Sequence, residues 1–484
     1  MSKFREISMS APTVIVWFRN DLRLHDHIPL TQAVKRFKNI VPFYCFDIRQ
    51  FKKTSVKLPQ TGPFRARFLI ESVADLKMSL KKLGSDLVVR MGYPEKEIAK
   101  IARQLNTNDV FTYEIVPRDE NKSESELKNF LGKRKLKIFP GNTLFSSDQL
   151  PFRISAFPAH FTEFRKLVEE HNHIEKPVAA PEKLPALPAG FDPGRIPTIQ
   201  ELGVPDIVPD ERAAIKFIGG ETHALNRVKN YIWQSQSLDQ YKNTRNQLLG
   251  ENYSSKFSPW LANGSLSVRY VYNEIKKYEE FVGKNDSPFW MIYELLWRDF
   301  FHFTALRYGK KLQRSGGMKG KAGHWRYDKE LFNSWKTGKT GVPFIDANMR
   351  ELNLTGYMSN RGRQNVASFL VKDLNVDWRM GATYFESMLI DYSFGSNWGN
   401  WNFAAGVGND PLENRYFNVL YQAQRYDPNG DYVRYWLPEL SSIKDEKVHQ
   451  VFRLTKYEQD KFDIHLGSSY PWAITMPAAW IEYY

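Results

Sequence analysis

Apolar and polar positions alternate between strand-like and helix-like patterns in the first third of the chain. Short apolar runs at 14–18, 40–46, 86–89 and 109–113 predict strands, and stretches with helical spacing lie between them. Pro94 stands where one of these helices is expected to begin. Strands that alternate with helices predict an α/β domain with a mostly parallel, Rossmann-like sheet. No G-x-G-x-x-G motif follows the first run, so an ordinary dinucleotide-binding loop is not expected.

The remaining two thirds of the chain indicate a linker followed by helices. Prolines recur between Pro177 and Pro209, which is typical of an extended connection. Farther on, Ser267 is expected to cap one helix and Pro288 to open another. We therefore predict an α/β domain at residues 1–140, an interdomain linker at 141–210 and a large all-α domain at 211–484.

The chain carries an excess of positive charge. Its 68 Lys and Arg residues against 54 Asp and Glu residues give a formal net charge of +14. Such an excess indicates a polyanionic partner such as nucleic acid, but a generally basic surface explains it equally well. At 484 residues the chain is long enough for more than one domain and for a sizeable buried site.

A single cysteine, Cys45, limits the chemistry of the chain. It excludes an intrachain disulfide, a Cys-rich zinc site and a four-Cys iron–sulfur cluster, and no metal site is expected. Residues 1–11 lack the apolar core of a secretory signal, and no uncharged apolar stretch is long enough to span a membrane. A cytoplasmic protein is therefore expected, with organellar targeting left open.

The segment 253–260 reads Tyr-Ser-Ser-Lys-Phe-Ser-Pro-Trp and offers one candidate binding loop. Hydroxyl and backbone N–H groups just before a Pro-initiated helix are suited to hold a phosphate, because the amino end of a helix carries partial positive charge. The simpler alternative is that Ser258 caps a helix with Pro259 at its first position and binds no ligand. The segment alone does not decide between the two.

Two further segments place polar groups on one helical face. Glu294, Trp297 and Arg298 occupy neighbouring positions, where Glu294 and Arg298 are spaced for an i,i+4 surface pair and Trp297 suits the core. Asn360 and Gln364 also share a face, and their amide groups suit the edge of a base or of a flavin ring. Asn360 is expected to cap its helix as well.

A third segment, 391–403, reads Asp-Tyr-Ser-Phe-Gly-Ser-Asn-Trp-Gly-Asn-Trp-Asn-Phe. Its small residues and tryptophans mix too irregularly for an ordinary amphipathic helix. We therefore predict a loop that is held against a large flat ligand.

Several motifs together resemble one known family. Residues 17–26 read Trp-Phe-Arg-Asn-Asp-Leu-Arg-Leu-His-Asp, which resembles the opening signature of photolyases and cryptochromes, and the segments described above follow in that family's order. The resemblance extends from about residue 13 to at least residue 440. The segments that resemble the cryptochrome DASH branch in particular are 241–245, 256–260, 400–402 and 405–410.

The resemblance implies FAD in a folded-up shape inside the all-α domain. Arg363 and Asp391 are expected to form a pair beside the flavin, and Asn397 to stand opposite its reactive nitrogen, as in repair enzymes. Ser393 stands where the family usually has Asp, so the hydrogen bond to that edge of the flavin ring is left open. The residues implied around the phosphates and the ribityl chain are Tyr241, Ser254, Ser255, Lys256, Phe257 and Ser258, with Arg298 nearby, and those implied at the flavin are Asn360, Arg363, Asp391, Ser393 and Asn397.

The resemblance also implies light-driven repair of cyclobutane pyrimidine dimers, chiefly in single-stranded DNA, by electron transfer from reduced flavin. Glu294 would hydrogen-bond the dimer, and Asn360 and Gln364 would hold its bases. Tyr357 stands where many duplex-repairing relatives have Trp, and Phe403 where they have Tyr or Trp. Both changes weaken stacking on a flipped dimer, which suits substrates that are already unpaired. The residues implied to line the dimer cavity are Trp297, Tyr357 and Phe403.

Three tryptophans, Trp325, Trp378 and Trp401, match the family's electron relay. Electron tunnelling decays steeply with distance, so a buried flavin needs oxidisable aromatic rings between itself and the surface. Arg361 and Arg415 are candidates for contacts with DNA phosphates, or else ordinary exposed cations.

The α/β domain is expected to carry an antenna pigment near the domain boundary, and the resemblance implies 5,10-methenyltetrahydrofolate. Glu114 matches a family position that contacts folate, although a solvent-exposed glutamate is an equally good interpretation. Two other functions stay open at this point: a blue-light receptor that signals with little or no repair, and a nucleic-acid binding module without a cofactor. The family default is a monomer.

Overall fold

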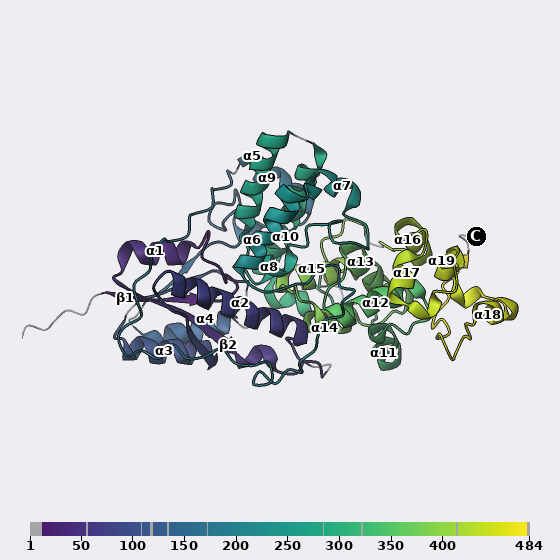
Figure 1. Cartoon of the computed structure of the whole chain (residues 1–484), viewed down its shortest axis with the longest axis horizontal. Helices are drawn as coiled ribbons and strands as arrows, with labels where there is room; N and C mark the ends of the chain where they lie inside the picture. Colours follow the sequence, from purple (N-terminus) through teal and green to yellow (C-terminus); the bar gives the residue numbers. More distant parts are fainter. Residues whose placement is uncertain are drawn as a thin grey trace, which may run out of the picture.

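A parallel sheet of five strands forms the centre of the amino-terminal domain (Figure 1). In the spatial order β3-β2-β1-β4-β5, its strands are β1 (Thr13–Phe18), β2 (Asn39–Asp47), β3 (Val88–Gly92), β4 (Asp109–Tyr113) and β5 (Lys135–Phe139). The strand pairs are parallel, so the predicted α/β class is confirmed. The computed structural model describes residues 12–481 except 55–56, 108, 117–119, 133–134, 172, 284, 321–322 and 413–414. The segment 1–11, which the sequence predicts not to be a secretory signal, lies outside the described residues.

Apolar side chains along the strands cover both faces of the sheet. The helices that pack on it are α1 (Ile28–Arg36), α2 (Pro63–Lys82), α3 (Pro94–Gln104) and α4 (Glu120–Leu131). Val14 and Val16 pack with α1 and α2, whereas Ile15 and Trp17 pack with α3 and α4. Because successive strand residues point to opposite faces, one apolar run serves both layers. Cys45 is buried in the layer of α3 and α4.

Strand β3 begins at Val88 and not at Asp86, where the sequence predicts its start. The Asp86 carboxylate accepts a hydrogen bond from the Leu87 N–H at 2.7 Å and pairs with the Lys77 ammonium at 2.7 Å. These contacts hold Asp86 in the turn after α2. The pairing of β3 with β2 therefore starts at Val88.

The segment 141–210 packs against both domains. It contains α5 (Phe161–His171), whose Phe161 lies in an apolar cluster of the helical domain. Farther along, the Pro193 carbonyl accepts a hydrogen bond from the Val89 N–H of β3 at 2.8 Å, and Leu184 is buried with the sheet's apolar cluster. The proline-rich connection therefore covers an edge of the sheet.

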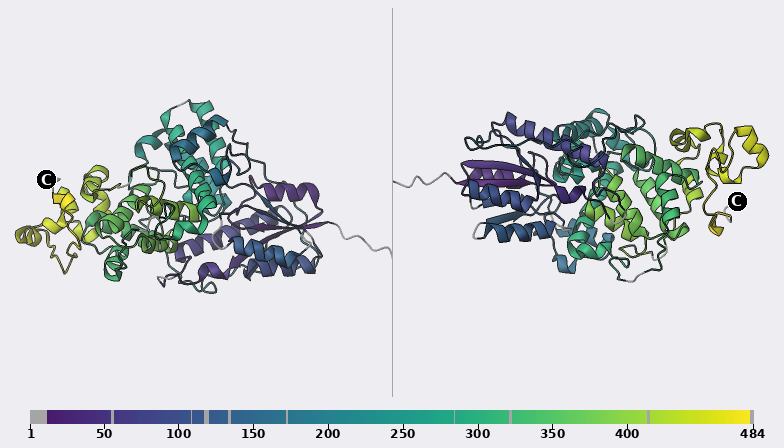
Figure 2. Two further views of the ribbon diagram at one scale, coloured as in Figure 1. Left: turned by 180° about the vertical axis from the view of Figure 1, so that it is seen from behind. Right: turned by 90° about the horizontal axis from the view of Figure 1, so that it is seen from below.

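The second domain is helical and extends away from the sheet (Figures 1 and 2), which confirms the predicted all-α domain. Its helices are α6 (Glu221–Val228), α7 (Tyr241–Thr244), α8 (Ser258–Ala262), α9 (Val268–Val282), α10 (Asp286–Tyr308), α11 (Lys329–Thr337), α12 (Pro343–Thr355), α13 (Asn360–Ser368), α14 (Trp378–Met388), α15 (Phe394–Ala404), α16 (Val419–Tyr426), α17 (Asp431–Trp436), α18 (Lys456–Phe462) and α19 (Ala478–Ile481). Shorter 3-10 or π turns in the chain are η1 (Ile48–Phe51), η2 (Ile154–Ala156), η3 (Lys229–Gln234), η4 (Ser237–Gln240), η5 (Gly309–Gln313), η6 (Phe369–Asp373), η7 (Pro438–Leu440), η8 (Glu446–His449) and η9 (Val451–Arg453).

Local capping sets the ends of two of these helices. Ser267 caps α9 as predicted, by accepting hydrogen bonds from backbone N–H groups of the first turn. Helix α10 begins at Asp286 and not at Pro288, because Asn285 supplies the cap and a proline is tolerated in the first turn. Within the described part of the chain, no helix has both the length and the apolarity to cross a bilayer.

The segment 391–403 is mostly helix, so the predicted loop is wrong. Helix α15 begins at Phe394 and packs against α10 through two glycines. A Cβ on Gly395 would lie 2.6 Å from the Phe301 carbonyl oxygen, and one on Gly399 would lie 2.3 Å from the Phe301 ring. The two helices therefore approach so closely that only glycine fits at these positions. The helix is buried on most of its sides, which explains why its sequence lacks a polar face.

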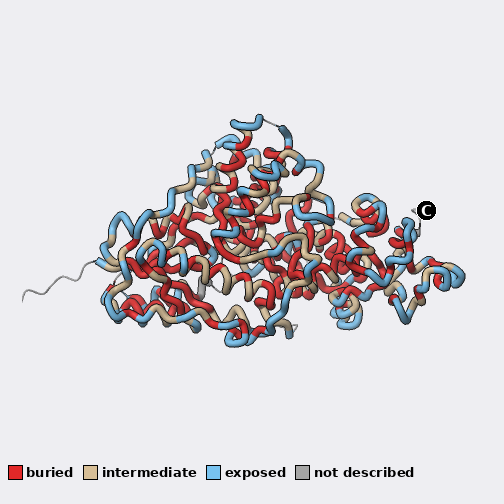
Figure 3. The backbone as a smooth tube through the Cα atoms, viewed as in Figure 1, coloured by how far each residue is buried: buried red, intermediate tan, exposed pale blue. Residues whose placement is uncertain are grey.

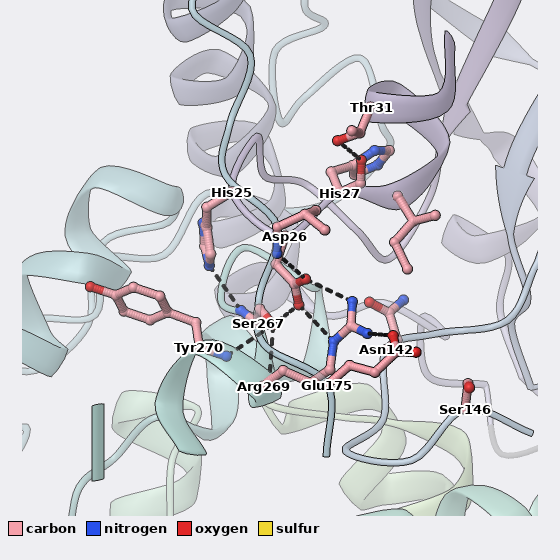
Figure 4. Close-up of polar contacts among 12 residues, drawn as sticks. His25, Asp26, His27, Thr31, Asn142, Ser146, Glu175, Ser267, Arg269 and Tyr270 are labelled. Carbon is pink, nitrogen blue, oxygen red and sulfur yellow. Dashed lines mark hydrogen bonds and ion pairs between the residues drawn. The ribbon is translucent and has the colours of Figure 1, made fainter. Parts of the chain in front are cut away.

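The signature segment 17–26 reaches the junction between the two domains (Figure 4). Asp26 is only 1% exposed, pairs with the Arg269 guanidinium at 2.7 Å and accepts a hydrogen bond from the Ser267 hydroxyl. Burial opposes the charge, but the guanidinium groups of Arg23 and Arg269 lower the pKa of Asp26. The ionised carboxylate thus ties the sheet domain to the start of α9. Figure 3 shows buried residues in both domains and where they meet.

Helix α10 adds a second junction contact through Asp299, which is fully buried. Its carboxylate accepts hydrogen bonds from the N–H groups of Leu144 at 2.7 Å and Phe145 at 3.3 Å. Burial raises the pKa of Asp299 to about 7, and the neighbouring Arg298 limits this rise.

We expect the titration of Asp299 to make the fold less stable as pH rises from about 5 to about 7. An unfolded Asp has a pKa of about 3.9, so the folded state holds this proton more tightly, and the stability present at low pH is lost as pH rises through the folded pKa. The loss is at most about 1.4 kcal/mol per pH unit. Urea unfolding midpoints at the two pH values test this expectation.

The matched variants for this measurement are Asp299→Asn and Asp463→Asn. Asparagine at 299 keeps an acceptor for both N–H groups and removes the titration, so its unfolding midpoint should change less with pH. Asp463 is 96% exposed and has a positive φ that asparagine tolerates, so its variant should follow the wild type. Parallel pH dependences of wild type and Asp299→Asn would contradict the role of Asp299.

Candidate functional site

A buried carboxylate, Asp391, stands at the centre of the candidate site. The Ser258 hydroxyl donates to Asp391 Oδ2 at 2.6 Å, and the Arg363 guanidinium donates to the same oxygen at 2.8 Å. The predicted pairing of Arg363 with Asp391 is therefore present. The other carboxylate oxygen, Asp391 Oδ1, is buried and has no hydrogen-bond partner among the described residues. Such an oxygen needs a donor, which a ligand N–H group would supply.

Ser258 does not cap its helix, so the capping role predicted for it is wrong. Helix α8 starts at Ser258 itself, and Phe257 precedes it as the capping residue without a side-chain hydrogen bond. The Ser258 hydroxyl is instead directed to Asp391, 133 residues farther along the chain. That contact is not visible in the local sequence.

The loop 250–257 in front of α8 is held from one side through its carbonyl groups. The Arg227 guanidinium donates to the carbonyls of Ser255 at 3.0 Å and Glu251 at 3.2 Å, and the Thr244 hydroxyl donates to the Tyr253 carbonyl at 2.9 Å. The carbonyls are thus turned toward α6 and α7. When the carbonyls of a loop are held on one side, its backbone N–H groups can point to the opposite side. Backbone N–H groups that have no partner within the loop are suited to bind a phosphate.

Lys256 belongs to this loop, and its side chain folds back against the loop. Its side chain is buried, its ammonium donates to the Glu251 carbonyl at 2.8 Å and sits 3.4 Å from the centre of the Tyr253 ring, and its φ is +55°. Burial lowers the pKa of Lys256 to about 7. The predicted phosphate residues Tyr241 and Phe257 are buried in the neighbouring apolar cluster.

Glu294 pairs with Arg245, the residue that follows α7, so the predicted surface pair with Arg298 is wrong. Arg298 donates instead to the carbonyls of Asn142 at 2.6 Å and Leu261 at 3.3 Å. Burial raises the pKa of Glu294, and Arg245 limits the rise. Arg245 belongs to a motif that the sequence identifies, but nothing local to it indicates the contact with Glu294.

Trp297 is half-buried and lies one turn after Glu294 on α10. Phe161 of α5 stacks on its ring with the centroids 3.8 Å apart and the planes 7° from parallel. This stacking fixes the plane of the Trp297 ring. Phe301 of the same helix also contacts the ring, with the centroids 5.5 Å apart, and the Trp297 side chain stays partly exposed. No sequence signal identifies Phe161, because it lies in the predicted linker.

Helix α13 positions the predicted amide pair. Ser359, and not Asn360, is its cap, since the Ser359 hydroxyl accepts the Gly362 N–H at 3.0 Å. Asn360 is exposed at the first helical position. The Gln364 amide oxygen accepts a hydrogen bond from the Arg361 guanidinium at 2.8 Å.

The remaining predicted cavity residues lie near arginines. Tyr357 is buried, with its ring 5.6 Å from the Arg363 guanidinium. The Phe403 ring lies 5.2 Å from the guanidinium of Arg415, which pairs with Asp410 at 2.6 Å. Arg415 is therefore neutralised at least in part by its own carboxylate partner.

The three predicted relay tryptophans lie near one another. The indole N–H groups of Trp378 and Trp325 donate to one carbonyl, that of Ser315, at 3.2 and 3.3 Å. Trp401 packs on α14, the helix that Trp378 begins, because a Cβ on Gly381 would lie 2.2 Å from its ring. Trp401 and Trp378 are buried, whereas Trp325 is half-buried. The three rings thus lead from the interior toward the surface.

Asn397 connects these rings to the Asp391 end of α15. It lies one turn before Trp401, is buried, and donates from its amide to the Ala382 carbonyl at 3.0 Å. Its carbonyl oxygen is left for another partner. Asn397 and Trp401 therefore share a face of the helix that follows Asp391.

A cavity of about 210 Å³ lies where the carboxyl ends of β1, β2 and β4 meet the helical domain. Ligands of parallel sheets bind at such carboxyl ends. Glu114 lines the cavity and accepts a hydrogen bond from the Ser147 hydroxyl at 2.9 Å, and burial raises the pKa of Glu114. Arg298 and Ser393 line it from the helical side. Ser393 precedes α15 but makes no capping hydrogen bond, so its hydroxyl is available to a ligand.

Comparison with known proteins agrees with this arrangement. Residues 290–479 match the family described as the FAD binding domain of DNA photolyase, and residues 14–186 match the DNA photolyase family. The two matches define a flavin-binding protein of the photolyase class.

Relatives narrow that class further. The chain is 52% identical to cryptochrome DASH of Gloeobacter violaceus, over 96% of this chain and 93% of that protein. It is 46% identical to cryptochrome DASH of Danio rerio, over 97% of this chain and 91% of that protein. The crystal structure of a Synechocystis sp. cryptochrome matches with a TM-score of 0.94 and 46% identity, covering 100% of this chain and 99% of that chain. The chain belongs to the cryptochrome DASH branch of the photolyase and cryptochrome family.

Proposed function

We propose that this chain repairs cyclobutane pyrimidine dimers, chiefly in single-stranded DNA, by light-driven electron transfer from bound reduced FAD. The observation that carries the proposal is the half-buried Glu294 carboxyl beside the stacked Trp297 ring on the same helix. This pair offers a hydrogen-bonding group and a flat apolar surface to one flipped pyrimidine pair. Family membership and the photolyase-type FAD domain support it.

The residues around Asp391 fit a flavin. Asp391 Oδ1 would accept a ring N–H, with Ser258 and Arg363 fixing the carboxylate, and Asn397 would face the ring from α15. Ser254 and Ser255, in the loop whose carbonyls are turned away, would hold the phosphates. When bound and reduced, FAD supplies the electron that opens the dimer after it absorbs blue light.

Glu294 would hydrogen-bond the dimer. Burial raises the pKa of its carboxyl and the pairing with Arg245 opposes the rise, and in its protonated form the carboxyl can donate to a pyrimidine carbonyl where negative charge develops. Trp297 would stack on the dimer, and Asn360 and Gln364 would orient its bases. Tyr357 and Phe403 would complete the cavity.

Illumination of the reduced protein with dimer-containing single-stranded and duplex DNA tests the proposal. We expect dimers to disappear from the single strand and to persist in the duplex. Loss of dimers from neither substrate would overturn the proposal and favour a blue-light receptor. Equal loss from both would overturn the preference for single strands.

Alanine at Glu294 is expected to lower the rate of dimer loss about tenfold, since a hydrogen bond to a charged group contributes at least about 1.5 kcal/mol. Glu294→Gln should restore most of the rate, because an amide N–H also donates. The rates are compared at equal flavin content under one lamp. Equal rates for the alanine and wild-type proteins would remove Glu294 from the mechanism.

Neutralising Arg361 is expected to weaken DNA binding and flatten its salt dependence. If the guanidinium contacts one phosphate of a single strand, the slope of log affinity against log salt falls by about 0.7 in Arg361→Ala. Arg326→Ala is the control, because Arg326 is 60% exposed and pairs with Asp328 at 3.2 Å. Titrations at several salt concentrations measure both slopes. Unchanged slopes for Arg361→Ala would argue against a phosphate contact, and the same measurement applies to Arg415.

The proposal includes 5,10-methenyltetrahydrofolate as an antenna in the cavity between the domains. Glu114 lines that cavity and is partly withdrawn from solvent, which suits a hydrogen bond to a pterin ring. A monomer in the cytoplasm completes the proposal, although relatives from Solanum lycopersicum and Arabidopsis thaliana carry the description chloroplastic/mitochondrial. Gel filtration and the absorbance spectrum of the purified protein test the monomer and the folate.

A further inference from the structure

Helix α16 presents tyrosine and arginine side chains to solvent. Its inner face, with Val419, Leu420 and Ala423, is buried in the core of the helical domain. Its outer face carries Tyr421, which is 38% exposed, and Arg425, which is also exposed. The helix contains no acidic residue.

These side chains form a row in which rings and guanidinium groups alternate. Arg425 donates to the Tyr421 hydroxyl at 3.4 Å and lies 5.5 Å from the centre of the Tyr426 ring. The Arg361 guanidinium of α13 lies 4.3 Å from the centre of the same Tyr426 ring. We call Tyr421, Arg425, Tyr426 and Arg361 the α16 row. Figure 1 shows α16 next to α13, the helix that carries Gln364.

Among the residues that the structure describes, no carboxylate forms an ion pair with Arg361 or Arg425 of the α16 row. Burial lowers the pKa of Arg361, and among its charged neighbours Arg245 and Arg425, both cationic, lower it further. Arg361 also stands in the first turn of α13, where the helix dipole disfavours a cation. Its Nε is buried without a hydrogen-bond partner among the described residues. An anion bound at this position would offset the repulsion from the two neighbouring cations and from the helix dipole, and it would accept a hydrogen bond from Nε.

The α16 row is continuous with the proposed dimer site. Arg361 donates to the Gln364 amide oxygen at 2.8 Å and to the Asn246 amide oxygen at 2.9 Å. A strand whose lesion reaches Gln364 would therefore pass its next phosphates over Arg361 and Arg425. Rings interleaved with arginines are the surface that unpaired nucleotides bind, because each base can stack while each phosphate meets a cation.

We propose that the α16 row binds the unpaired nucleotides that flank a lesion, with a base stacked on Tyr421 and phosphates held by Arg425 and Arg361. The inference rests on the proposed function, since it takes the flanking strand to be the one that carries the dimer. A base inside a duplex is paired and cannot stack on Tyr421. Tyr421 would thus add affinity for single strands only.

Binding in the dark tests the proposal with three oligonucleotides that carry one central dimer. The first has long single-stranded flanks, the second has the same flanks without bases, and the third has flanks of a single nucleotide. Tyr421→Ala should weaken binding to the first at least about fivefold, from a stacking contribution of about 1 kcal/mol or more, and leave binding to the other two unchanged. Tyr457→Ala removes a tyrosine that is 78% exposed elsewhere and should bind all three like wild type.

Arg425→Gln gives an independent measurement on the same oligonucleotides. It should weaken binding to both long-flanked strands, with and without bases, and lower their salt dependence, because the phosphates remain in both. An equal loss for Tyr421→Ala on long and short flanks, or no loss on any, would overturn the proposal.

The dark assay also separates this inference from the proposed function. Dimer loss under light is scored on the same samples. Flank-dependent binding without dimer loss would support the role of the α16 row and overturn the proposed repair activity. Dimer loss without flank-dependent binding would support repair and overturn the role of the α16 row.

Discussion

Alanine at Asp391 is expected to lower the affinity for FAD about 10- to 150-fold, so that the protein purifies with little bound flavin. The carboxylate accepts hydrogen bonds from both Ser258 and Arg363, and its second oxygen, which has no partner in the described part of the chain, can accept one from a ligand N–H. A hydrogen bond to a charged group contributes about 1.5–3 kcal/mol, which gives this range. The ratio of flavin absorbance to protein absorbance after gel filtration, and a titration of the flavin-free protein with FAD, measure the loss.

Two further variants separate a binding effect from misfolding. Asp391→Asn keeps the shape of the side chain but removes its charge, so its affinity for FAD should lie between those of alanine and wild type. Asp463→Asn removes a carboxylate that is 96% exposed and follows α18, and it should retain flavin. Urea unfolding of the flavin-free proteins should show that Asp391→Ala still unfolds cooperatively. Full flavin content in Asp391→Ala would remove this carboxylate from the binding site.

The sequence predicts the sheet domain well because its signals are local. The apolar run at 109–113 coincides with β4, and Pro94 opens α3 as expected. The start of β3 is missed because the Asp86 side chain is held by Lys77, from the helix that precedes it. Such a contact depends on how helix and strand meet, and the sequence pattern alone does not contain it.

In the helical domain, by contrast, one prediction from the local pattern is wrong. The sequence predicts a loop at 391–403, since a helix buried on most sides has no amphipathic period. Gly395 and Gly399 are the signal that was available, because two glycines four residues apart allow a close helix contact. Composition suggests flexibility at such positions, whereas tertiary packing makes them part of a helix.

The site depends on pairs that are far apart in the chain. Resemblance to the family identifies Asp391 and Arg363, but not the donation from Ser258 or the pairing of Glu294 with Arg245. The signature segment is a further example, since Asp26 meets Arg269 across a separation of 243 residues. A motif therefore locates a residue, while the fold decides which partner it has.

Phenylalanine at Trp401 is expected to suppress photoreduction of the bound flavin almost completely, while repair by chemically reduced protein continues. Trp401 lies on the helix that follows Asp391, one turn after Asn397, and packs on α14 close to Trp378. Trp378 and Trp325 share the Ser315 carbonyl, which keeps their indoles near each other. We expect one electron to pass from an external thiol through Trp325, Trp378 and Trp401 in turn. A phenylalanine ring is too hard to oxidise to take part.

Trp398→Phe is the matched control for this experiment. Trp398 lies on the same helix, is buried, and contacts the Trp378 ring with the centroids 5.8 Å apart, yet it does not occupy a relay position. Its variant should therefore photoreduce like wild type. Photoreduction is followed by flavin absorbance under blue light with the thiol present, and repair by loss of dimers after reduction with dithionite. If Trp398→Phe loses photoreduction and Trp401→Phe keeps it, the electron reaches the flavin by a path that does not include Trp401. The packing around Trp378 would then govern the transfer.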